Sequence, residues 1–212
     1  MDDHTTTKLD AFRSLVHKSG ALQTELTTLD SAIRERDAIK TRIGTCDDES
    51  EARKLLGDLT RAEESVTLKS IRDPRLRDDL AAIVKEAEFA HFEVMSAIDA
   101  MLNGLADVTI QPFRELLLSL QPEEENTKRD DANNVVLKAL VPAVLVEDLF
   151  KMLHDASHSV GVATSDPYGP AKGLRVALEI TDALLARLPE AHKERKRHAA
   201  ACAAFRKVLA NG

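Results

Sequence analysis

Apolar residues recur along most of the chain at steps of three and four, which is the spacing of one face of an α-helix. The clearest run begins near the N-terminus and predicts a helix from about residue 6 to residue 43. At 1.5 Å per residue this helix would be a rod of roughly 50 Å. Its apolar seam, with Ser19 as a polar interruption, is typical of a coiled coil. The seam consists of Phe12, Leu15, Leu22, Leu26, Leu29 and Ile33.

The most apolar helical segment covers residues 80–105 and has apolar residues on nearly every side. Phe89 and Phe92 lie opposite its main stripe. A helix that is apolar all round belongs inside a bundle. We therefore predict that residues 80–105 form the helix around which the others pack, with residues 135–153 on the Phe89 and Phe92 side.

Prolines and glycines divide the rest of the chain into shorter predicted elements. Asp73 and Pro74 together resemble a helix start, with aspartate as the cap and proline in the first turn. The glycine- and proline-rich residues 161–173 predict a loop. We expect six to seven helices in total. After the first, they cover residues 47–70, 74–107, 112–120, 135–157 (with Pro142 as a kink or a restart), 174–188 and 189 to the end.

The predicted fold class is all-α, an elongated antiparallel helical bundle. Residues 121–134 are the most polar stretch and have no large apolar side chain, so they predict an exposed loop and a boundary. Residues 1–120 would form a long-helix, coiled-coil-like bundle. Residues 135–212 would form a smaller C-terminal helical cluster packed on the first.

Composition and charge limit the kind of core, the partners and the compartment that we expect. The chain is 43% apolar but has no Trp, so its core must be mostly aliphatic. Its net charge of −7 argues against nucleic acid or an anionic membrane as the main partner. Cys46 and Cys202 are too few for a metal framework and favour a reducing cytoplasm. The polar N-terminus predicts no signal peptide, and the apolar run at 135–146 is shorter than the about 20 residues that cross a membrane.

Two acid–histidine pairs are the candidates for metal chemistry. Glu88 and His91 have the E-x-x-H spacing of di-metal helical bundles, and Asp155 and His158 have a D-x-x-H spacing. His154 and His158, one helical turn apart, suit zinc, with His91 as a third ligand. We favour the alternative interpretation, in which these pairs occur by chance and His91 is hydrogen-bonded beside the core.

A basic cluster near the C-terminus is the candidate for contact with phosphates or an acidic partner surface. Its usual role is a solvated helix face, and no aromatic platform for bases accompanies it. The nucleophile motif G-x-S-x-G and the glycine-rich dinucleotide fingerprint are both absent from the sequence. The cluster consists of Lys193, Arg195, Lys196 and Arg197.

These patterns favour a non-enzymatic interaction or scaffold protein that acts through coiled-coil-like surfaces without a cofactor. We expect self-association, most simply as a homodimer, because the N-terminal seam is longer than the predicted second helix can cover. The alternative is a metal-dependent helical-bundle enzyme that uses His91, His154 and His158. A third hypothesis is a nucleic-acid accessory protein that uses the basic cluster.

Overall fold

The computed structural model describes residues 3–119, 128–166 and 169–210, and nearly all of them are helical. Within these ranges there is no strand, so the predicted all-α class is confirmed. The helices are α1 (Asp3–Gly44), α2 (Glu49–Ser119), α3 (Lys128–Ser165) and α4 (Pro170–Ala210).

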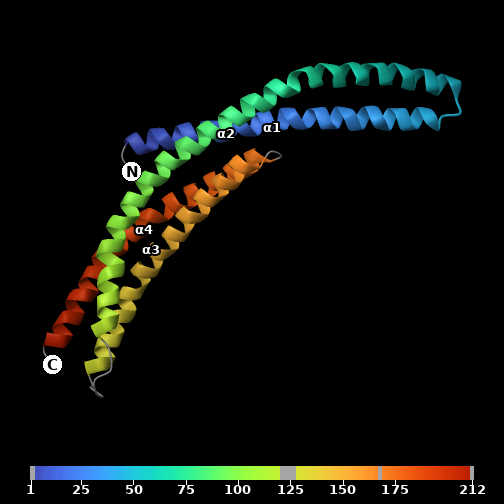
Figure 1. Ribbon diagram of the computed structural model, residues 1–212. Coiled ribbons are helices and arrows are strands. Elements are labelled where there is room, and N and C mark those ends of the chain that lie inside the picture. Colours follow the sequence, from blue (N-terminus) through green and yellow to red (C-terminus); the bar gives the residue numbers. More distant parts are fainter. Residues whose placement is uncertain (1–2, 120–127, 167–168, 211–212) are drawn as a thin grey trace.

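The molecule is elongated because two helical hairpins overlap over only part of their length (Figure 1). The first hairpin is α1 with the first half of α2, and the second is α3 with α4, which run antiparallel to each other. The second half of α2 packs on the second hairpin, and α4 also contacts α1. We call residues 31–75, where the first hairpin extends past the α3–α4 turn, the arm.

The prediction of six to seven helices is wrong, because prolines bend or join helical segments here without ending them. α2 runs through Pro74 and Pro112, α3 through Pro142 and α4 through Pro189. A proline inside a helix removes one backbone hydrogen bond and introduces a clash, which long packed helices can tolerate. Asp73, the predicted cap, lies inside α2 and does not begin a helix. Its Oδ2 accepts a hydrogen bond from Arg77 Nε at 2.6 Å.

The loop predicted at residues 161–173 is mostly helical. α3 continues to Ser165 and α4 already begins at Pro170. Gly173 serves helix packing, since a Cβ there would lie 2.8 Å from the Cβ of Ala163. In the predicted 121–134 loop, residues 128–134 belong to α3 and the others lie outside the described residues.

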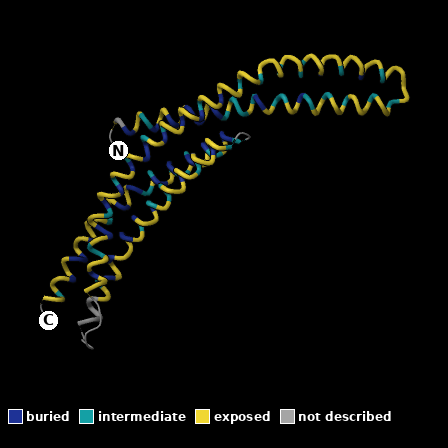
Figure 2. Tube along the Cα trace, viewed as in Figure 1, coloured by how far each residue is buried: buried dark blue, intermediate teal, exposed yellow. Residues whose placement is uncertain are grey.

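The second half of α2 is central, as predicted, but it is buried on one face only (Figure 2). Ile98 and Leu102 are fully buried, whereas Phe89 and Phe92 are 65% and 66% exposed. The expectation that residues 135–153 cover these two phenylalanines is therefore wrong. α1, α3 and α4 all pack against the opposite, buried face of α2. In the described ranges no helix combines the length and the apolar character that crossing a membrane requires.

Candidate binding cleft

The predicted interaction seam of α1 lies inside the chain, against α2. Phe12, Leu15 and Leu26 are buried and share a core cluster with Leu80 and Val84 of α2. The rest of the seam is half-buried, namely Leu22, Leu29 and Ile33. Because α2 is much longer than its predicted counterpart, it runs beside the whole seam, and none of these six residues is fully exposed. The seam therefore serves mainly to pack α1 on α2.

His91 sits at the junction of α1, α2 and α4. Its side chain is 3% exposed, its Nε2 lies 3.4 Å from Thr181 Oγ1, and its ring centroid is 4.9 Å from that of Phe12. Burial lowers the pKa of His91 from 6.5 to about 4. His91 is thus a neutral, hydrogen-bonded core residue at neutral pH.

The other proposed metal ligands lie elsewhere on the surface. Glu88, His154, Asp155 and His158 are all exposed, and His154 Nδ1 is 3.7 Å from Asp155 Oδ1. In the part of the chain that the structure describes, no group of three or more His, Cys, Asp or Glu residues is placed to hold a metal ion. The structure does not bring His91 together with His154 and His158.

A buried histidine–cysteine pair escaped the sequence analysis, although its four-residue spacing on a helix was readable. The two ring nitrogens of His198 lie 3.7 and 3.8 Å from Cys202 Sγ. Burial lowers the pKa of His198, against a hydrogen bond to the Val108 carbonyl, and burial raises the pKa of the Cys202 thiol. Because both groups are buried and neutral, this pair lacks the thiolate that a cysteine nucleophile requires.

The predicted basic cluster is exposed near the C-terminal end of α4. Arg197 Nη1 lies 3.3 Å from Glu194 Oε2, so part of its charge is offset within the helix. Lys193, Arg195 and Lys196 project from the surface without a carboxylate partner among the described residues. This end of α4 is therefore a positively charged surface on an acidic protein.

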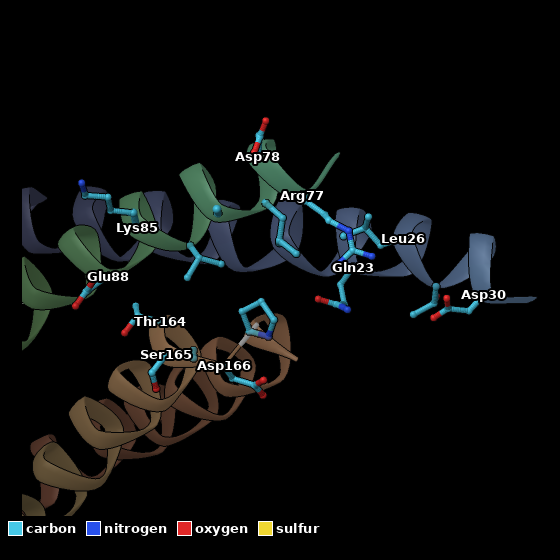
Figure 3. A pocket seen from close by; sticks show the side chains of 16 residues that line it. Gln23, Leu26, Asp30, Arg77, Asp78, Lys85, Glu88, Thr164, Ser165 and Asp166 are labelled. Atoms are coloured by element: carbon cyan, nitrogen blue, oxygen red, sulfur yellow. The ribbon is translucent and has the colours of Figure 1, made fainter. Parts of the chain in front are cut away.

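A cleft of about 720 Å³ lies where the arm joins the α3–α4 turn (Figure 3). Its volume is within the range of about 300–1,000 Å³ that is typical of ligand pockets. Aliphatic side chains from all four helices form its floor, and polar side chains surround them. The floor consists of Leu26 of α1, Leu80 and Val84 of α2, Ala163 of α3 and Pro170 of α4.

Carboxylates dominate the rim of the cleft. Figure 3 shows Asp30 of α1, Glu88 of α2 and Asp166 beyond α3 on the side of the cleft, whereas Asp78 and Lys85 turn away from it.

Arg77, the basic residue that stays on the rim, already has a carboxylate partner. The guanidinium of Arg77 lies toward Gln23, and its Nε donates to Asp73. The rim therefore favours a cationic group over an anionic one.

The cleft could not be found from the sequence, because its parts come together only through the crossing of two hairpins. Gly173 allows α4 to approach α3 closely beside their turn. The sequence pattern marks Glu88 only as a possible metal ligand. The chain matches no family model, no curated protein and no solved structure, so the functional argument rests on this geometry.

Proposed function

We propose that this chain is a non-enzymatic helical interaction protein and that the cleft binds a protein partner. The observation that carries the proposal is the cleft itself: an aliphatic floor, open to the surface and surrounded by charged side chains. A buried apolar centre with a polar rim is the usual anatomy of a protein-binding site. The chemically distinctive side chains, His91, His198 and Cys202, are buried away from the cleft lining.

The arm supports a scaffold role because it exposes both of its helices. Ion pairs join its two helices and anchor its base, with Lys40 Nζ 3.1 Å from Glu63 Oε1 within the arm and Arg72 Nη2 2.6 Å from Glu25 Oε1 just before it. Such exposed pairs contribute little energy each, so the two helices of the arm are held together mainly by buried apolar side chains, among them Ala32, Leu55 and Ala62. A cytoplasmic location, which the two lone cysteines favour, belongs to the same proposal.

Site-specific photocrosslinking in the native cells tests the proposal. A benzophenone amino acid replaces Thr164, which lines the cleft, or Thr60, a threonine on the arm that is also exposed. We expect a discrete protein adduct from position 164 that position 60 does not give. The absence of an adduct at position 164, or the same adducts at both positions, would overturn the proposal.

A further inference from the structure

The C-terminal part of α4 carries a row of lysines on its outer side. Lys193, Lys196 and Lys207 fall on one face at helical spacing, together with the small residues Ala200 and Ala203. All five are exposed. Among the described residues, no carboxylate forms an ion pair with any of these three lysines. We call these five residues the basic face.

The cleft offers the complementary charge. Asp30 and Glu88 are exposed on its rim, and neither has an ion-pair partner in the described part of the chain. Both carboxylates belong to the same opening as the aliphatic floor (Figure 3). Figure 3 places them at opposite ends of the cleft, so each carboxylate could receive a different ammonium group of one docking surface.

The basic face and the cleft of one molecule cannot meet. α4 begins at the cleft with Pro170 and reaches Lys193 only after about 35 Å of helix, at 1.5 Å per residue. Figure 1 shows the C-terminal end of α4 pointing away from the α3–α4 turn. Any contact between the two surfaces must therefore join two molecules.

We propose that the basic face of one copy docks in the cleft of a second copy, head to tail. This inference rests on the proposed function, because it names the partner that the cleft binds. The lengths are comparable: Arg77 and Glu88 span about 16 Å of α2 along the cleft, and the basic face from Lys193 to Lys207 spans about 21 Å of α4. The short alanine side chains between the lysines let the docking helix come close to the aliphatic floor.

The proposed contact is heterologous, since it joins two different surfaces. Each bound copy still offers one open cleft or one open basic face, so association continues into a chain or a ring. Because exposed charges make the contact, added salt screens it and weakens association. We therefore expect the average mass to rise with protein concentration at low salt and to fall back as salt is added.

Two charge variants and light scattering test the inference. The cleft variant is Asp30→Lys with Glu88→Lys, which reverses the charge, and the face variant is Lys193→Gln with Lys196→Gln and Lys207→Gln, which only removes it, so that the two altered surfaces do not attract each other. All five positions are exposed, and circular dichroism with thermal melting checks that both variants fold. Each variant alone should stay monomeric. Their equimolar mixture should stop at twice the 23.3 kDa chain mass, because it holds only one intact cleft for each intact face.

Each outcome supports or overturns the inference. A wild-type chain that is monomeric at every concentration and salt overturns it, as do variants that associate like the wild type. If either occurs while Thr164 crosslinks to a different protein, the proposed function stands and only the second copy as partner is rejected. If the cleft gives no specific adduct at all, the proposed function itself falls. A dimer that appears only in the mixture supports both.

Discussion

Phe12 of α1 and His91 of α2 pack with ring centroids 4.9 Å apart and ring planes inclined by 52°. Thr181 of α4 closes the same junction through its hydroxyl. Around it, Arg13 Nη2 lies 2.7 Å from Asp182 Oδ1, which joins α1 to α4 directly. This is where α1, α2 and α4 meet.

Truncating Phe12 should destabilise the fold more than truncating any exposed phenylalanine. Phe12 is fully buried, so Phe12→Ala should lower the free energy of unfolding by about 3–5 kcal/mol. Phe92 is 66% exposed, and Phe92→Ala should change it by no more than about 0.5 kcal/mol. Urea unfolding measures both. Equal losses for the two variants would contradict the burial described for this junction.

Stability should fall as the pH drops from 6.5 toward 4. The pKa of His91 is about 4 in the folded chain and 6.5 in the unfolded chain, so between these values the unfolded chain binds the proton. The stability is complete above pH 6.5, and the loss from this group amounts to about 3 kcal/mol by pH 4. Burial lowers the pKa of His198 too, which adds a loss of the same sign.

His91→Gln isolates this effect, with His154→Gln as its control because His154 is exposed. Unfolding free energies measured between pH 7 and pH 4 should fall less steeply for His91→Gln than for the wild type. The control should follow the wild type. A slope that is unchanged in His91→Gln would show that His91 does not govern the acid sensitivity.

Two glycines should respond oppositely to alanine. A Cβ at Gly173 would meet Ala163 Cβ at 2.8 Å and the Ser159 carbonyl oxygen at 2.9 Å, so Gly173→Ala should destabilise by about 1–3 kcal/mol. A Cβ at Gly161 would meet nothing within 4 Å, so Gly161→Ala should stabilise α3 by about 0.5–1 kcal/mol. Thermal melting of the two variants compares them, and the same sign of change in both would refute the close α3–α4 crossing.

The local part of the fold was readable from the sequence. The heptad seam predicted a helix over residues 6–43, and α1 spans Asp3–Gly44. Pro74 is typical of a helix start, but α2 runs through it, and a single residue does not reveal the packing that offsets the cost of a proline inside a helix. Phe89 is apolar but exposed, because apolar character does not reveal on which side of a helix its neighbours lie. The cleft depends on which helices cross and where, and such long-range contacts leave no periodic signal in the sequence.

Hydrogen–deuterium exchange of the full chain tests most directly whether the cleft is where a second copy binds. It is measured at low salt, at two protein concentrations on either side of association. The account predicts slower exchange at the higher concentration in two separate places, the cleft segment 77–88 and the basic segment 193–207. Exchange that is unchanged in both segments, or protection in only one of them, would contradict it.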